Sequence, residues 1–150
     1  QHFKLARDAG WNITVHAGEA DGPHSIWQAI DELGATRIGH SVAAREDANL
    51  MDFMANNNIS IECCLTSNFQ TGACTNIAEH PIKTFIERGI VVTLNTDDPG
   101  VSGIEIGDEY RLAREVVGLS AKQLTQIQLN GVEVAFVGDS VKRELLSQLR

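Results

Sequence analysis

Short apolar runs rich in β-branched residues alternate with helical segments along this chain, and this alternation most constrains its fold. The expected strands are 12–19, 36–41, 59–65 and 90–95. Helical segments at 23–34, 45–57 and 81–89 separate them, with a polar loop at 66–76. Strands that are apolar throughout and joined by helices are typical of a parallel sheet covered by helices. The pattern therefore predicts an α/β protein.

Only helical segments are expected after the last strand. Ser120 and Gln123 form a Ser-x-x-Gln capping box, which indicates a helix start. The expected helices cover 103–117, 120 to about 137, and 139–149. The chain opens without Met on the back end of an amphipathic helix, in which Phe3 and either Leu5 or Ala6 would face a core. This opening predicts a chain that starts within a domain.

Bulk composition excludes several classes of partner. With 150 residues, 43% of them hydrophobic, the chain can build one sizeable core. A net charge of −8 without any Lys/Arg-rich run argues against nucleic acid, and the apolar runs are far too short to span a membrane. The three cysteines show no Cys-x-x-Cys spacing, which favours a reduced, cytoplasmic chain without a cysteine-built metal site.

Two architectures fit the strand–helix alternation. One is an open doubly wound sheet, and the other is part of a (β/α)8 barrel. A whole barrel needs about 250 residues, so this chain would supply only about half of one. The periodicity does not choose between them.

Polar, chemically capable residues follow every expected strand. In parallel α/β folds the carboxyl edge of the sheet is where ligands bind. Taken singly, a strand-end His is usually structural, and Asp-Asp-Pro-Gly is a good turn. Taken together, His and Asp can bind Zn²⁺ while a second His and a Glu transfer protons, which is the chemistry of metal-assisted hydrolysis. The residues concerned are His16, Glu19, His40, Thr66, Ser67, Asn68, Asp97 and Asp98.

Four motifs in this order resemble the C-terminal half of the adenosine deaminase family, a group of zinc-dependent (β/α)8 barrels among the amidohydrolases. They are VHAGE (15–19), IGHS (38–41), CLTSN (64–68) and NTDDPG (95–100), and the similarity extends over essentially all 150 residues. The resemblance implies the second half of a barrel: four parallel strands with covering helices and extra C-terminal helices. Residues 1–150 would then form a single partial domain.

The resemblance also implies roles for individual residues. His16 becomes a zinc ligand, and Asp97 a second ligand that also contacts the attacking water. Glu19 becomes the proton donor to purine N1, and His40 would orient or deprotonate the attacking water. For the substrate, Gly18 and Asp98 become binding residues, with Asp98 accepting a hydrogen bond at N7.

The implied reaction is hydrolysis of adenosine or 2′-deoxyadenosine to the keto purine nucleoside (inosine from adenosine) and ammonia, in purine salvage, with one Zn²⁺ per complete barrel. Two departures from the family pattern stand out. Ser41 occupies a position where the family commonly has Gly, and the His-x-His zinc ligands of the first strand are absent, since His2, His24 and His80 match no family ligand. The chain is therefore expected to need the N-terminal half-barrel, or another chain, over its open sheet edges. Alone it should bind metal weakly and be inactive.

Other functions stay open at this point. A related deaminase of adenine or another 6-aminopurine fits the same chemistry, and an inactive half-barrel that only binds or assembles is the alternative from a different class. Cytidine-type zinc deaminases use His-x-Glu with Pro-Cys-x-x-Cys, which Cys63-Cys64 does not match. A nucleotide-binding open sheet should show a Gly-x-Gly-x-x-Gly turn or a P-loop, and the sequence has neither.

Overall fold

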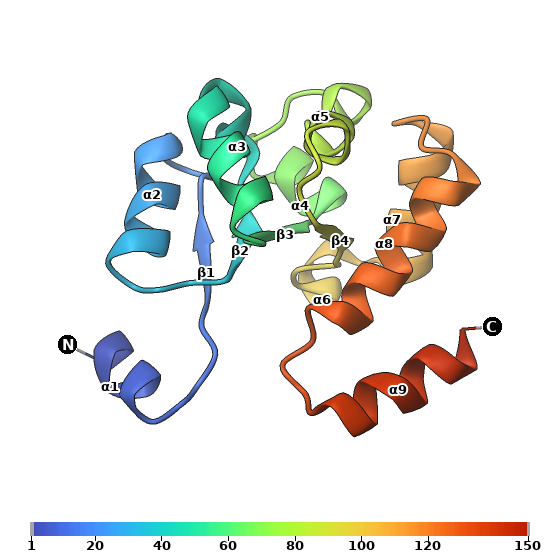
Figure 1. The fold of residues 1–150 in the computed structure, drawn as a ribbon. Helices are drawn as coiled ribbons and strands as arrows, with labels where there is room; N and C mark the ends of the chain where they lie inside the picture. Colours follow the sequence, from blue (N-terminus) through green and yellow to red (C-terminus); the bar gives the residue numbers. More distant parts are fainter. Residues whose placement is uncertain (1, 150) are drawn as a thin grey trace.

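The computed structural model describes residues 2–149 and contains a four-stranded parallel sheet in the order β1-β2-β3-β4. The strands are β1 (Thr14–Ala17), β2 (Arg37–His40), β3 (Ser60–Cys63) and β4 (Val92–Leu94). Strands adjacent in the chain are adjacent in the sheet, with helices between them (Figure 1). A doubly wound sheet reverses its strand order at a switch point, whereas a barrel adds each strand on the same side. The order therefore confirms the predicted half-barrel.

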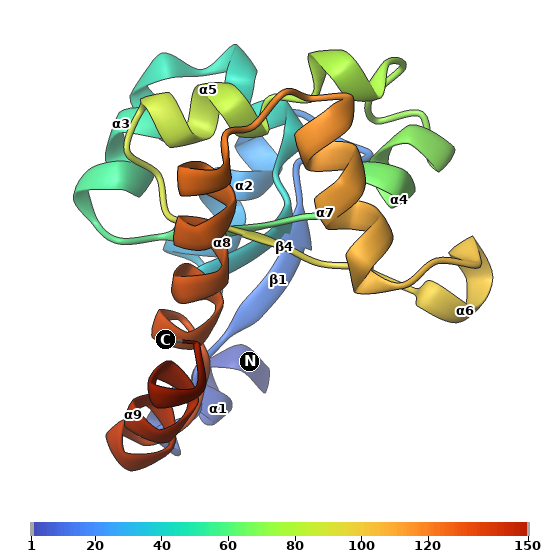
Figure 2. The same ribbon diagram turned by 90° about the vertical axis from the view of Figure 1, so that its right-hand side faces the viewer.

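Helices pack beside the sheet and continue beyond the last strand (Figure 2). Pro23 occupies the first turn of α2, and the predicted capping box of Ser120 and Gln123 is present at the start of α8. The helices are α1 (His2–Asp8), α2 (Pro23–Asp31), η1 (Val42–Glu46), α3 (Ala48–Asn56), α4 (Leu65–Gln70), η2 (Ile77–Glu79), α5 (Ile82–Glu87), α6 (Pro99–Ser102), α7 (Ile106–Glu115), α8 (Ala121–Glu133) and α9 (Asp139–Gln148).

The core lies between the sheet and the helices on its outer face. Side chains of α2, α3 and α5 are fully buried there, as are the central residues of β2 and β3; examples are Ile26, Leu50, Phe85, Ile38 and Ile61. The opposite face of β1 is open, since Thr14 and His16 are both exposed. One face of the sheet is thus a packed core, while the other remains accessible at β1.

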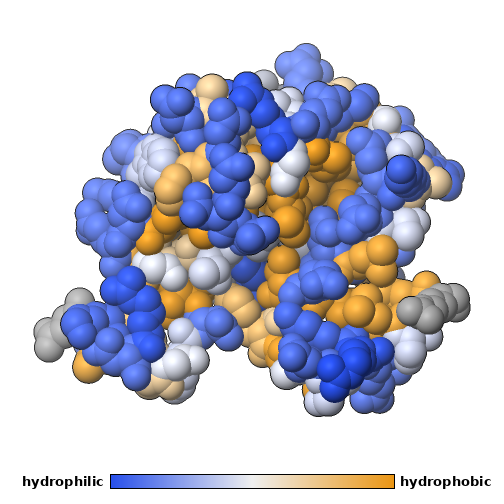
Figure 3. Space-filling model, in the orientation of Figure 1, coloured by the Kyte–Doolittle hydropathy of each residue, from blue (hydrophilic) through white to orange (hydrophobic). Residues whose placement is uncertain are grey.

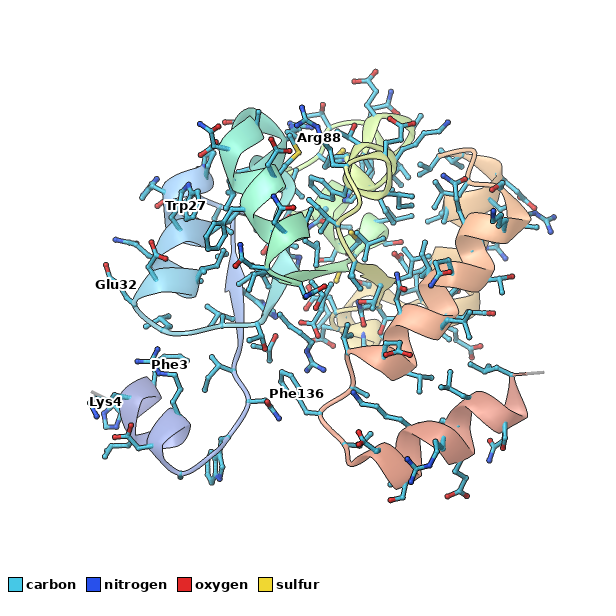
Figure 4. All side chains as sticks on the ribbon, in the orientation of Figure 1. Phe3, Lys4, Trp27, Glu32, Arg88 and Phe136 are labelled. Atoms are coloured by element: carbon cyan, nitrogen blue, oxygen red, sulfur yellow. The ribbon has the colours of Figure 1, made fainter. Side chains whose placement is uncertain are left out.

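The segment after α8 packs against the end of the sheet where β2 begins. Phe136 points from this segment toward the sheet (Figure 4), and its ring centroid lies 3.6 Å from Cζ of Arg37. The same guanidinium donates a hydrogen bond of 3.0 Å to the carbonyl oxygen of Val134. These contacts tie the last helices to β2 at the end opposite the carboxyl edge.

The structure differs from the sequence prediction in two segments after β3. The expected loop at 66–76 contains helix α4, because Glu109 of α7 accepts hydrogen bonds from the backbone N–H groups of Leu65 (2.7 Å) and Thr66 (3.1 Å). The helix expected from Gly103 begins at Ile106. Gly103 has a φ of +66° and ends α6 instead, as a left-handed glycine commonly does.

The terminal helices bury less than the sequence predicted. Phe3 and Leu5 of α1 are 38% and 59% exposed, so they do not face a core within the described residues. Ala6, the alternative to Leu5, is partly buried and packs against the core. Helix α9 buries none of its residues, and hydrophobic surface lies beside it in the lower part of Figure 3. Across residues 2–149, no helix is both long and apolar enough to cross a membrane.

Candidate functional site

The carboxyl edge of the sheet brings the predicted site residues together. His16 lies within β1, and Glu19 lies two residues beyond the end of that strand. His40 is the last residue of β2, and Asp97 follows β4. One donor atom from each of His16, His40 and Asp97 lies within 4.8 Å of the other two. Nitrogen and carboxylate donors are the ligand types that Zn²⁺ accepts, so the donor set fits a metal ion.

His16 lies across the neighbouring strand. It pairs in register with Gly39, where an added Cβ would come 2.6 Å from Cδ2 of the His16 ring. The His16 and His40 rings are edge to face, with centroids 4.5 Å apart. The ring of His16 therefore occupies space that only a glycine at position 39 leaves open.

His40 is held in an unusual and buried position. It is 1% exposed, and its φ of +69° is followed by +52° at Ser41, so two non-glycine residues in a row adopt left-handed conformations. The Nε2 atom of His40 lies 3.2 Å from Nδ1 of His16 and 3.4 Å from Oε2 of Glu19. Burial lowers the pKa of His40, and the nearby charge of Glu19 opposes this change.

Glu19 is oriented by two side chains of the segment after β3. Its Oε1 accepts hydrogen bonds from Oγ1 of Thr71 (2.9 Å) and Nδ2 of Asn68 (3.3 Å). Its other oxygen is the one that faces His40. A cavity of about 270 Å³ opens beside Glu19, between the loop after β1 and η1.

The two adjacent aspartates have different partners. Asp97, with a φ of +61°, accepts a 2.7 Å hydrogen bond from Oγ of Ser67. Asp98 is exposed and caps α6, accepting a 3.3 Å hydrogen bond from the backbone N–H of Val101. The capping bond satisfies one oxygen of Asp98 and gives this residue the turn role considered for it, while its contact with the purine stays a prediction.

Gly18 shapes the turn that delivers Glu19. Its φ is +70°, and an added Cβ would come 2.4 Å from the side chain of Ile26. Its N–H donates to Oγ of Ser25 (2.9 Å), and its carbonyl accepts from the N–H of Ala43 (2.8 Å). Both backbone groups are used within the chain, so substrate binding by Gly18 stays a prediction.

Three residues that sequence reasoning left without a role support the site. Asn68 contacts both Glu19 and His40, Thr71 contacts Glu19, and His80 lies behind Asn68 with its Nε2 3.1 Å from Oδ1 of that residue. Asn68 belongs to the CLTSN motif, which was a usable signal. His80 lies in no motif, and only the folded chain shows its position.

A parallel half-barrel with His, Glu and Asp at its carboxyl edge defines a class of protein: the (β/α)8 barrels that carry a polar, metal-competent site there. The profile of the adenosine deaminase family matches residues 1–150. The chain belongs to the adenosine deaminase family.

Individual relatives agree with this assignment. An adenosine deaminase of Salmonella typhi is 60% identical over 144 residues, which are 96% of this chain and 43% of that protein. Among solved structures, an adenine deaminase from Arthrobacter aurescens superposes with a TM-score of 0.93 at 26% identity, over 98% of this chain and 45% of the other. An amidohydrolase from Burkholderia ambifaria with bound Zn gives 0.89 at 25%, over 98% and 42%. The chain thus spans less than half the length of these relatives.

Proposed function

We propose that this chain is the second half of a (β/α)8 barrel that hydrolyses adenosine and 2′-deoxyadenosine to the keto nucleoside and ammonia in purine salvage. The observation that carries the proposal is the convergence of His16, Glu19, His40 and Asp97 at one sheet edge. The 60% identity to an adenosine deaminase supports adenosine as the substrate. A cytoplasmic location and the absence of nucleic-acid partners stay predictions.

Zinc is the proposed metal, with His16 and Asp97 as the ligands from this chain and the remaining ligands from the first half of the barrel. The donor types, and the bound Zn of the amidohydrolase relative, support this choice. Bound zinc would supply a Lewis acid that makes water a better nucleophile near neutral pH.

The chain's own residues divide the remaining work. Glu19, with one oxygen held by Thr71 and Asn68, donates a proton to N1 of the purine ring. His40 positions the attacking water, and Asp97, held by Ser67, contacts the same water. Asp98 and Gly18 are proposed to contact the purine, Asp98 through N7.

The first half of the barrel is the proposed partner of this chain. Within residues 2–149, β1 pairs only with β2, and β4 only with β3, so both outer strands offer an unpaired edge. Barrel closure would pair both edges and cover the face on which His16 is exposed. Residues 1–150 alone are expected to lack turnover.

A substrate panel tests the proposal. The full-length protein should be assayed with adenosine, 2′-deoxyadenosine, adenine and N6-substituted purines, by loss of the 6-amino chromophore and release of ammonia. We expect the highest kcat/KM for the two nucleosides. A preference for free adenine, as expected of an adenine deaminase such as the Arthrobacter aurescens relative, would overturn the proposed substrate. The proposed hydrolysis of the 6-amino group would still hold. Zinc-loaded full-length protein without activity on any purine would contradict the proposed deaminase function.

A further inference from the structure

A buried line of hydrogen-bonding groups lies behind His40. Nδ1 of His40 is 3.0 Å from Nδ2 of Asn68, and Oδ1 of Asn68 is 3.1 Å from Nε2 of His80. At its far end, Nδ1 of His80 is 3.2 Å from the backbone N–H of Ile82. The three side chains are 1%, 0% and 3% exposed. No solvent therefore competes for these bonds, and each must have a donor on one side and an acceptor on the other.

The backbone N–H of Ile82, at the far end of this line, determines which group donates and which accepts in each hydrogen bond. A peptide N–H can only donate, so Nδ1 of His80 must accept the bond from Ile82. Burial lowers the pKa of His80 to about 4, which keeps the ring neutral near pH 7. A neutral imidazole carries one proton, so that of His80 lies on Nε2 and is donated to Asn68.

The donor-to-acceptor direction of these hydrogen bonds also fixes the orientation of the Asn68 amide beside His40. Because Oδ1 of Asn68 accepts from His80, its amide nitrogen is the group that faces His40 and donates to Nδ1. That atom of His40 then carries no proton. In the neutral ring the proton lies on Nε2, which faces Oε2 of Glu19, a group able to accept it.

We propose that His80 and Asn68 are positioning residues that hold His40 as its Nε2–H tautomer, so that His40 donates a hydrogen bond to the attacking water and does not remove its proton. This inference rests on the proposed function and chooses between the two roles considered for His40. A carboxylate at the same edge of the sheet, and not His40, then accepts the proton that the water loses.

The opposite arrangement conflicts with the chain's own bonds. For His40 to act as a base through Nε2, its proton would move to Nδ1 and the Asn68 amide would turn over. The amide would then point a donor at Nε2 of His80, whose other nitrogen already accepts from Ile82. A neutral ring cannot accept at both nitrogens, so one buried donor would lose its partner.

Nitrogen NMR of the full-length, zinc-loaded protein tests the tautomer directly. The protein is labelled with ¹⁵N-histidine, and the His40 signals are assigned as those missing from His40→Ala. We expect the proton on Nε2 of His40. In Asn68→Asp a carboxylate faces both rings and accepts from each, so the His40 proton should move to Nδ1. Thr71→Val removes the other hydrogen bond to Glu19 and should leave the tautomer as it is.

Kinetics supply the second readout. In His80→Leu the Asn68 amide loses the donor that orients it, and we expect kcat to fall about 10- to 100-fold, with zinc content and KM close to wild type. His80→Gln keeps an amide donor and should recover most of the rate. A wild-type His40 proton on Nδ1, or a tautomer unmoved in Asn68→Asp, would overturn the inference. The NMR readout needs no substrate, so failure of the proposed function would not be mistaken for failure of this one.

Discussion

Replacing Gly39 with alanine tests whether the backbone of β2 positions the metal ligand on β1. The new Cβ would lie 2.6 Å from Cδ2 and 3.2 Å from Nε2 of His16. Carbon atoms in contact prefer about 3.5 to 4.0 Å, so the ring must retreat by about 1 Å. Metal ligands must be placed to within about 0.2 Å, so the displaced ring cannot keep its bond without further movement.

The expected result is a loss of zinc affinity with little loss of fold. We expect Gly39→Ala in the full-length protein to bind zinc about 10- to 100-fold more weakly in chelator competition. Its kcat/KM should fall about 100-fold, as for other displacements of about 1 Å in an active site. The matched control is Gly131→Ala, because an added Cβ there meets no atom within 4 Å and the residue lies inside α8.

The control should keep its zinc and gain about 0.8 to 1 kcal/mol of stability, since alanine favours a helix more than glycine. If Gly39→Ala bound zinc as tightly as the wild-type protein, the close approach of Gly39 and His16 would have no role in the site.

Four further predictions concern the full-length protein. Glu19→Gln should lower kcat about 100- to 10,000-fold with KM little changed, because it removes the proton donor; stopped assays at saturating adenosine measure this, and an unchanged kcat excludes the role. Asp97→Ala should lose zinc together with activity, as metal analysis will show, and full metal content would remove Asp97 from the ligand set. Glu109→Leu should cost about 1 to 6 kcal/mol in urea unfolding, because the buried N–H of Leu65 and the partly buried N–H of Thr66 lose their acceptor, at up to about 3 kcal/mol each. Glu109→Gln keeps one acceptor and should cost less. Because burial lowers the pKa of His80 from 6.5 to about 4, the unfolded chain binds this proton more readily. The contribution of His80 to the free energy of unfolding should therefore be level above pH 6.5 and fall by about 3 kcal/mol as pH drops to about 4. His80→Gln should remove that part of the pH dependence, and an equal slope in both proteins would contradict the assignment.

The sequence predicted the four strands and the site at their carboxyl edge, because both follow from local patterns of apolar and polar residues. Apolar runs bounded by helix signals fixed four strands, and parallel pairing then placed His16, Glu19, His40 and Asp97 at one edge whatever their side-chain geometry. Helix α4 escaped prediction because its cap, Glu109, lies more than 40 residues away in the chain. Local sequence carries no sign of such a contact.

The roles of His80 and Gly39 could not be predicted from the sequence, because both depend on contacts between segments distant in the chain. His80 has no motif, and its role depends on a backbone N–H at Ile82 and on burial, which only the folded chain shows. Gly39 was part of a recognised motif, but its reason for being glycine is the ring of His16 on the next strand. Sequence pattern thus located the reacting groups, whereas tertiary contacts determine how they are held.

Anomalous X-ray scattering at the zinc edge, on crystals of the full-length protein with its native metal, tests the central claim most directly. The account predicts a peak at the carboxyl edge within bonding distance of His16 and Asp97, with Glu19 and His40 beside it and not bonded to the metal. A zinc peak elsewhere, or an active deaminase crystal with no metal at this edge, would contradict it.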